Sequence, residues 1–391
     1  MGETNQNNEI CVVCPTIRDT STMLKRYADN ARDNIFDLNR LQFLILTEDF
    51  CDKHRIKRSI DEAGVSGEVF NEQDRIEWMK RHDLDAFRPL IPRRSHAETS
   101  FGLLWLYSHG FSYGIFIDDD TLPTHEDFFG DHMRNLTETR SVVFLESTSR
   151  WVNVLHYSFE QHRLYPRGYP YSKMNETYAA RAAQTDRVVV SQGLWTNVPD
   201  LDAVRLLVSG NLDGGCSAKL DEKSYDQDFV VADHNYVTLC SMNLAFSAEV
   251  VPYFYQLPMD DNSQKIGRFD DIWSGLILKR ICDRLHYQFV SGHPLCCHSK
   301  APRNVFSDLK AEVNGLEINE HLGDILDSIE LSSGTGSQMY IQLGESLRQG
   351  DWSHLQNGSF LNLMGARMVE WTRCCEFLEA NRHLVRMRGR D

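Results

Sequence analysis

The chain has 391 residues, of which 41% are hydrophobic and 25% are charged, and its formal net charge is −15 at pH 7. This length suffices for one large domain with an appendage or for two domains, and the composition is ordinary for a globular protein. The strong negative charge makes nucleic acids and anionic membranes poor partners.

The N-terminal segment MGETNQNNEI has neither the basic start nor the apolar run of a secretion signal. No stretch of the chain approaches the roughly 18 apolar residues that a membrane span requires. The ten cysteines are scattered through a large chain, which is typical of reduced thiols. We therefore expect a cytoplasmic protein with no membrane span.

Short runs of β-branched and aromatic residues predict buried strands. In chain order they are residues 10–14, 43–46, 114–117, 142–145, 187–191 and 244–246. Helical patterns at 97–109 and 271–285 alternate with these runs. Strands that alternate with helices predict an α/β fold with a mostly parallel central sheet.

The strand signal fades from about residue 303 onward. Residues 321–329 and 361–378 have helical patterns, and the polar stretch 209–229 resembles an exposed loop or insertion. We expect one catalytic α/β domain at residues 8–305. A helical C-terminal region, residues 306–391, is expected to pack on it.

Polar residues follow three of the predicted strands, as PTIR at 15–18, TED at 47–49 and DDD at 118–120. Ligands of open α/β sheets bind beyond the carboxyl ends of the strands. Strand alternation would point Asp118 and Asp120 to the same side and Asp119 to the other. Such a pair of carboxylates suits Mg²⁺ or Mn²⁺, which keep open positions for phosphate oxygens. The alternative is an acidic turn that only ends a strand.

Three further stretches carry candidate site residues, each with a structural alternative. Asp270 and Asp271 precede a predicted helix, where carboxylates also act as caps; their functional interpretation is a base or an electrostatic stabiliser. His298, in CCHSKA, is either structural or a further metal ligand. Arg167, in YPRGYPYS, either forms a surface ion pair or contacts a sugar or phosphate.

Several of these stretches occur in one order along the chain, namely PTIR, IDDD, RGYP, GLWxNxPDxDA, MNLAF, IGRxDDxW, ICDxL and HSKA. MVEW follows at 368–371. Together they resemble the reversibly glycosylated polypeptides, also called UDP-arabinopyranose mutases, over about residues 9–378. The resemblance implies a GT-A-like fold that binds nucleotide sugars and a divalent metal, usually Mn²⁺ or Mg²⁺. It also implies interconversion of UDP-L-arabinopyranose and UDP-L-arabinofuranose, with reversible glycosylation of the protein by UDP-sugars.

The resemblance assigns the DxD-type metal pair to Asp118 and Asp120, and a later metal ligand to His298. Asp118 is expected to face the nucleotide as well. Family members usually have cysteine after their DDD, where this chain has Thr121.

The uridine would be held by the PTIR segment and by the acidic residue after the second strand, here Thr16, Arg18 and Asp49. Family members have QDG where this chain has TED at 47–49. Residues 151–162, which should shape the sugar pocket, also depart from the pattern of the plant proteins.

The arginine that becomes glycosylated in the family matches Arg167. A guanidinium has a pKa above about 12 and is a poor nucleophile. It would need a close carboxylate to take a proton or to orient it, and the candidates are Asp270 and Asp271. Arg167 could therefore be a covalent carrier or a clamp for the sugar or phosphate.

We expect a metal-dependent UDP-sugar mutase with a UDP-sugar as its partner, and a homo-oligomer. A glycosyltransferase that passes the sugar from a UDP-sugar to a glycan or small-molecule acceptor is the alternative. A degenerate member that serves as an assembly partner would not need the aspartate triplet or RGYP, and both are present.

Overall fold

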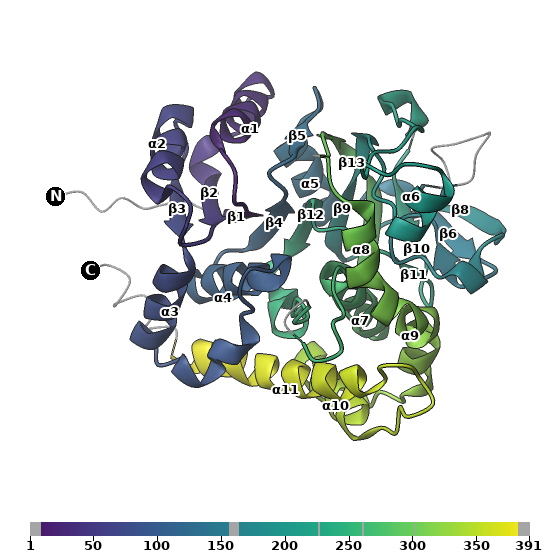
Figure 1. Ribbon diagram of the computed structural model, residues 1–391. Helices are drawn as coiled ribbons and strands as arrows, with labels where there is room; N and C mark the ends of the chain where they lie inside the picture. The colour runs from purple at the N-terminus through teal and green to yellow at the C-terminus, as the bar shows by residue number, and fades with distance from the viewer. Residues whose placement is uncertain (1–8, 156–163, 226, 260–261, 301, 382–391) are drawn as a thin grey trace.

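The computed structural model describes residues 9–155, 164–225, 227–259, 262–300 and 302–381. One large sheet runs through the molecule in the order β3-β2-β1-β4-β12-β9-β13-β10-β6-β8, with β5 beside β13, and β11 and β7 form a small second sheet (Figure 1). The strands are β1 (Ile10–Pro15), β2 (Leu41–Leu46), β3 (Gly67–Phe70), β4 (Tyr113–Ile117), β5 (Thr121–Pro123), β6 (Ser141–Ser147), β7 (Trp151–Val152), β8 (Tyr178–Gln184), β9 (Val188–Asn197), β10 (Phe229–Val231), β11 (Tyr236–Val237), β12 (Asn243–Ser247) and β13 (Gln288–His298).

The first half of the large sheet is parallel. Strand β1 pairs in parallel with β2 and β4, and β2 pairs in parallel with β3. Strand β12 then runs antiparallel to β4 and β9, and beyond it parallel and antiparallel pairs are mixed. All residues of β2 are buried, which is typical of parallel strands covered by helices on both faces. The six strands predicted from the sequence are all present, and the α/β class is confirmed.

The α-helices cover both faces of the sheet and continue past its last strand. They are α1 (Ser21–Asp33), α2 (Lys53–Ala63), α3 (Glu72–Arg81), α4 (Thr99–His109), α5 (Phe128–Thr137), α6 (Ala203–Val208), α7 (Asp270–Arg284), α8 (Val305–Glu312), α9 (Leu316–Ser328), α10 (Gly336–Gln349) and α11 (Ser359–Ala380). Short 3₁₀ segments include η2 (Asp85–Leu90), η3 (His96–Glu98) and η7 (Ala248–Tyr253).

Helices α10 and α11, drawn in yellow, run along one side of the molecule beneath α4 and α7 (Figure 1). Helix α11 contacts η7, η2 and α4. The indole Nε1–H of Trp371 in α11 donates to the carbonyl oxygen of Val251 at 2.8 Å, and its ring stacks on that of Tyr255. The hydrophobic core is continuous from Ile10 to Leu378, so the helical region after residue 305 packs on the sheet domain through shared apolar contacts.

Two general expectations concern the cysteines and the membrane. All ten cysteines lie in the described part of the chain and are free thiols, most of them buried. Among the described residues, no helix combines the length and the apolar character that crossing a membrane would require.

Candidate active site

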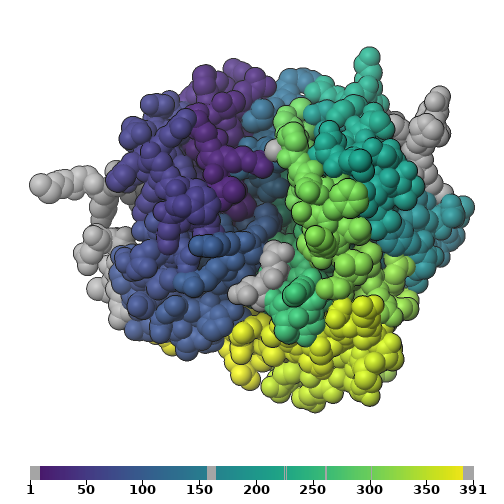
Figure 2. Space-filling model, in the orientation of Figure 1, coloured from purple at the N-terminus to yellow at the C-terminus, as the bar shows by residue number. Residues whose placement is uncertain are grey.

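Two adjoining cavities lie beyond the carboxyl ends of β1 and β4. The larger has a volume of about 450 Å³ and the smaller about 220 Å³. Four residues line both of them: His96, Asp118, Asp120 and Arg303. Figure 2 shows the surface hollowed between the purple N-terminal elements and the green segment around residues 300–315. This is the position at which an α/β sheet binds its ligands.

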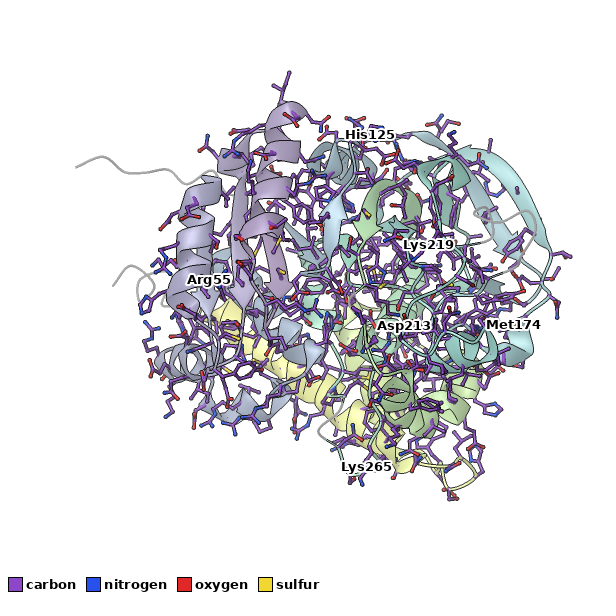
Figure 3. All side chains as sticks on the ribbon, turned by 45° about the horizontal axis from the view of Figure 1, so that its top comes forward. Arg55, His125, Met174, Asp213, Lys219 and Lys265 are labelled. Carbon is purple, nitrogen blue, oxygen red and sulfur yellow. The ribbon has the colours of Figure 1, made fainter. Side chains whose placement is uncertain are left out.

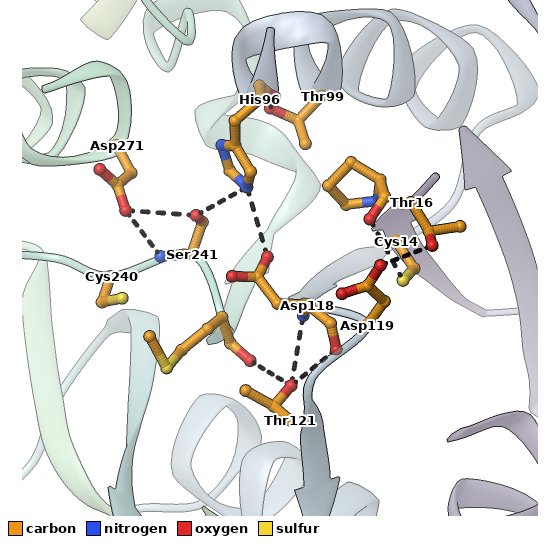
Figure 4. Close-up of polar contacts among 12 residues, drawn as sticks. Cys14, Thr16, His96, Thr99, Asp118, Asp119, Thr121, Cys240, Ser241 and Asp271 are labelled. Atoms are coloured by element: carbon orange, nitrogen blue, oxygen red, sulfur yellow. Dashed lines mark hydrogen bonds and ion pairs between the residues drawn. The ribbon is translucent and has the colours of Figure 1, made fainter. Parts of the chain in front are cut away.

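The three consecutive aspartates form a tight turn between β4 and β5. The backbone N–H of Thr121 donates to the carbonyl oxygen of Asp118 at 3.2 Å, and the Thr121 hydroxyl donates to the same oxygen at 2.8 Å (Figure 4). The turn spreads the three carboxylates. Asp118 and Asp120 line the smaller cavity, whereas Asp119 does not. All three aspartates line the larger cavity, and the turn, not strand alternation, sets the directions of their side chains.

Asp119 is the carboxylate that holds the PTIR segment in place. The Thr16 hydroxyl donates to one of its oxygens at 2.6 Å, and Arg18 Nη1 lies 2.6 Å from the other. Arg18 also lies 3.5 Å from a carboxylate oxygen of Asp120. Burial and the neighbouring aspartates raise the pKa of Asp119, although Thr16 and Arg18 oppose this. Thr16 and Arg18, which the family resemblance assigns to the uridine, both line the larger cavity.

Asp118, Asp120 and His298 all line the smaller cavity. His298 is buried, and its Nδ1–H donates to the carbonyl oxygen of Val198 at 2.7 Å. Its Nε2 lies 3.9 Å from Asp120 Oδ1. Metal-binding histidines commonly have their second nitrogen fixed by a backbone carbonyl, as Nδ1 is here. The donor set therefore fits a divalent ion, although no three such side chains in the described residues form a ready-made metal site.

His96 is a site residue that the sequence analysis missed. Its Nδ1 lies 2.8 Å from Asp270 and its Nε2 lies 3.3 Å from Asp118 and 3.3 Å from the Ser241 hydroxyl (Figure 4). Burial opposes its charged form, yet Asp270 and Asp118 raise the pKa of His96 well above its ordinary value. A lone histidine one residue before a predicted helix carries no pattern that would have identified it.

Arg167 lies in a cradle of three acceptors. Its Nε donates to Asp200 at 3.0 Å, its Nη2 lies 3.3 Å from Asp271, and its Nη1 donates to the backbone carbonyl of Arg268. Burial opposes its charge, but Asp200 and Asp271 raise the pKa of Arg167 well above its ordinary value. The structure therefore brings Asp271 to Arg167, whereas Asp270 faces His96. Asp200 lies in the GLWxNxPDxDA motif but was not singled out from the sequence.

The buried acids around Arg167 differ in their proton affinity. Burial opposes ionisation of Asp270, but His96 outweighs it and lowers the pKa of Asp270. Asp200 behaves in the same way, with Arg167 lowering its pKa. For Asp271 burial dominates, and its pKa is raised. Acids whose environments push their pKa values apart suit different roles, and Asp271 is the one suited to take and return a proton.

The acidic contact after β2 differs from the one expected. Asp49 is exposed, lies outside both sets of cavity-lining residues, and accepts a hydrogen bond from the backbone N–H of Gln73 at 3.1 Å. Its neighbour Glu48 is buried, lines the larger cavity and accepts from the backbone N–H of Arg94 at 3.1 Å. Phe50, 69% exposed, lies at the same cavity.

Three cations border the smaller cavity on the side of α8. Arg268 lies 2.7 Å from Glu312, and Arg303 lies 2.8 Å from Asp308. Lys300 lies two residues after His298, the last residue of β13. Residues 156–162, which were expected to help shape the sugar pocket, lie outside the described residues.

The family model described as "Reversibly glycosylated polypeptide" matches residues 5–380. UDP-arabinopyranose mutase 3 of Arabidopsis thaliana is 31% identical over 236 residues, which cover 60% of this chain and 60% of that protein. UDP-arabinopyranose mutase 1 of Arabidopsis thaliana is 31% identical over 238 residues, covering 60% and 62%. The matched region thus spans about 60% of the length of these curated relatives.

Two solved structures of glycosyl-transferring enzymes resemble the chain distantly. One is a mannosyltransferase from Pyrobaculum calidifontis in complex with GDP-Man and Mn²⁺, with a TM-score of 0.38, 10% identity, and coverage of 93% of this chain and 85% of that one. The other is glucosyl-3-phosphoglycerate synthase from Mycobacterium tuberculosis with Mn²⁺ and UDP, with a TM-score of 0.38, 12% identity, and coverage of 80% and 79%. Such low scores leave the chemistry of the site to be argued from its own residues.

Proposed function

The chain belongs to the reversibly glycosylated polypeptide family, and on that premise we propose that it is an isomerase that interconverts UDP-L-arabinopyranose and UDP-L-arabinofuranose. The matched relatives are named as UDP-arabinopyranose mutases. The observation that carries the proposal is the contact of Arg167 with Asp271 in the cavity that Asp118 and Asp120 also line.

The two cavities suggest how a UDP-sugar would lie. The uridine would occupy the larger cavity, against Thr16, Arg18 and Glu48. The sugar would occupy the smaller one, beside Arg167 and Asp271. The diphosphate would cross the shared boundary, beside Asp118, Asp120 and Arg303, which line both cavities.

A divalent ion, Mn²⁺ or Mg²⁺, is part of the proposal, with Asp118, Asp120 and His298 as the residues that would hold it. When bound, such an ion would neutralise the charge that the diphosphate gains as the leaving group. His96 would keep Asp118 oriented through its contact with Asp270 at the other ring nitrogen.

The chemical steps are assigned to Arg167 and Asp271. A nitrogen of Arg167 forms a bond to the anomeric carbon while the bond from that carbon to the UDP oxygen breaks, and Asp271 takes the proton that the nitrogen loses. Asp271 then passes this proton to the ring oxygen, which leaves the anomeric carbon as a hydroxyl while a double bond forms between that carbon and the Arg167 nitrogen. The 4-hydroxyl adds to the same carbon, closes the five-membered ring and returns its proton to Asp271. The UDP oxygen finally displaces Arg167, which regains its proton from Asp271. No electrons are gained or lost, and a trapped intermediate is the reversibly glycosylated protein.

The test is incubation of the purified protein with UDP-L-arabinofuranose and Mn²⁺, with chromatography of the products. Wild-type protein should form UDP-L-arabinopyranose at constant total UDP-sugar. Arg167→Lys should form neither isomer nor glycosylated protein, yet still bind UDP, because the lysine keeps the charge but loses the planar set of donors. Arg150→Lys is the control, since Arg150 is half-exposed and pairs with Asp327 away from the cavities.

Three other outcomes would change the proposal. Substantial activity of Arg167→Lys would make Arg167 a clamp and overturn the covalent scheme. If the protein binds UDP but forms no UDP-L-arabinopyranose, the proposed substrate pair is wrong. Release of UDP that depends on an added acceptor would make the protein a glycosyltransferase.

A further inference from the structure

The side-chain nitrogen of Lys300 is a buried polar atom for which the described residues provide no hydrogen bond. Lys300 lines the smaller cavity, just after β13. A buried ammonium without a partner costs free energy, because the group has lost its water and gained nothing in exchange. A bound ligand is one of the explanations that such a group calls for.

The neighbouring charges indicate that the partner is an anion. The two other cations on this side are already satisfied by acids of α8, Arg268 by Glu312 and Arg303 by Asp308. The side chain of Asp200 acts on Lys300 through space, but it accepts the Nε–H of Arg167. Among the described residues, Lys300 is therefore the one of these three cations whose side-chain nitrogen forms no hydrogen bond or ion pair.

The position of Lys300 in the smaller cavity indicates which part of the proposed substrate it contacts. Arg303 lines both cavities, as do Asp118 and Asp120, whereas Lys300 lines only the smaller cavity that contains Arg167. With the nucleoside in the larger cavity and the sugar in the smaller, the phosphate next to Lys300 is the one bonded to the sugar.

We propose that Lys300 donates hydrogen bonds to the sugar-linked phosphate of a nucleoside diphosphate sugar and stabilises it as the leaving group. This assignment rests on the proposed function. When the bond between the anomeric carbon and the phosphate oxygen breaks, its electron pair stays on that oxygen, and Lys300 keeps its own protons throughout. Charge-assisted hydrogen bonds to such an oxygen strengthen as its charge grows. The residue is thus more important for the reaction than for recognition of the nucleoside.

The experiment compares the binding of UMP and UDP by calorimetry, with Mn²⁺ present, for the wild-type protein and for Lys300→Met. We expect Lys300→Met to weaken UDP binding by about 10- to 100-fold, the range of one to two charge-assisted hydrogen bonds. UMP lacks the second phosphate, so its affinity should change less than about twofold. Lys219→Met is the matched control, because Lys219 is exposed in the polar segment 209–229 (Figure 3) and lines neither cavity.

A second measurement separates a loss of binding from a loss of folding. Without nucleotide, Lys300→Met should resist urea at least as well as the wild type, because it removes a buried polar atom that has no hydrogen bond among the described residues. Equal losses of UMP and UDP affinity, or unchanged UDP affinity, would overturn the assignment of Lys300. Failure of the wild-type protein to bind UDP at all would instead overturn the proposed function on which the assignment depends.

Discussion

Glu48 and Asp49 are neighbours in the sequence, yet only Glu48 reaches the cavity beside Thr16. Both follow β2, where successive side chains point in opposite directions. The sequence analysis chose Asp49, since either acid fits the description of an acidic residue after the second strand. The buried position of Glu48 and its bond from the backbone of Arg94 make it the residue available to a nucleoside.

This difference gives a prediction at the scale of one residue. Glu48→Gln should weaken UDP binding by about tenfold, because an ionised acceptor forms a hydrogen bond roughly twice as strong as a neutral one. Asp49→Asn should change the affinity less than twofold, since its side chain is exposed, accepts a hydrogen bond from Gln73 and lies outside both sets of cavity-lining residues. Calorimetric titration of both variants with UDP shows which of the two acids contacts the nucleoside. Equal effects of the two substitutions would contradict the assignment of Glu48.

At the scale of elements, α10 and α11 approach each other through two glycines. A Cβ atom at Gly344 would lie 2.9 Å from the carbonyl oxygen of Gly365, and one at Gly365 would lie 2.5 Å from the backbone nitrogen of Arg348. Both distances are shorter than a carbon contact tolerates. The two helices therefore pack backbone against backbone, and this brings Trp371 of α11 onto the core.

Gly365→Ala should force the two helices apart and lower the free energy of unfolding by about 1–3 kcal/mol, the usual cost of overpacking. Glu376→Ala, on an exposed face of the same helix, should change it by less than about 0.5 kcal/mol. Urea unfolding followed by tryptophan fluorescence measures both. If Gly365→Ala unfolds at the same urea concentration as Glu376→Ala, the close crossing of α10 and α11 is wrong.

At the scale of the whole molecule, the buried pair Glu48 and Glu98 shares one cation. Arg75 Nη2 lies 2.9 Å from Glu98 and 3.8 Å from Glu48. Burial first, and then Glu48, raise the pKa of Glu98 to about 8 against the pull of Arg75. The folded protein therefore holds a proton on Glu98 at pH values where the unfolded chain has lost it.

The sign of the effect on stability follows from that proton. Between the ordinary pKa of a glutamate and a pKa of about 8, the unfolded state binds fewer protons, so the free energy of unfolding falls as the pH rises. The slope contributed by one group is about 1.4 kcal/mol per pH unit. Urea unfolding at pH 5, 6.5 and 8 should show a smaller decline for Glu98→Gln than for the wild type. The free energy of unfolding of Glu68→Gln, a change at an exposed position, should decline with pH as that of the wild type does. Parallel curves for all three proteins would contradict the assignment of a retained proton to Glu98.

The chain has the α/β fold that its sequence patterns predicted, because the apolar runs of its buried strands can be recognised from the local sequence alone. Strands such as β2 are apolar on both faces and can be recognised without knowing their neighbours. Strand β8 could not be, because its YAARAAQ sequence has little strand propensity and its conformation comes from pairing with β6. The same distinction applies to the site residues. Arg167 and the aspartate turn lie in recognisable motifs, whereas the partners of His96 come from segments far away in the sequence.

Helix α11 also has a consequence for the synthesis of the protein. All the candidate site residues precede residue 304, so the ribosome delivers them well before it delivers Trp371. Until then, η7 and Tyr255 lack the ring that covers them and the donor that Val251 accepts. A reading frame interrupted before residue 359 would therefore release a chain that contains every site residue but exposes an apolar surface to chaperones and proteases.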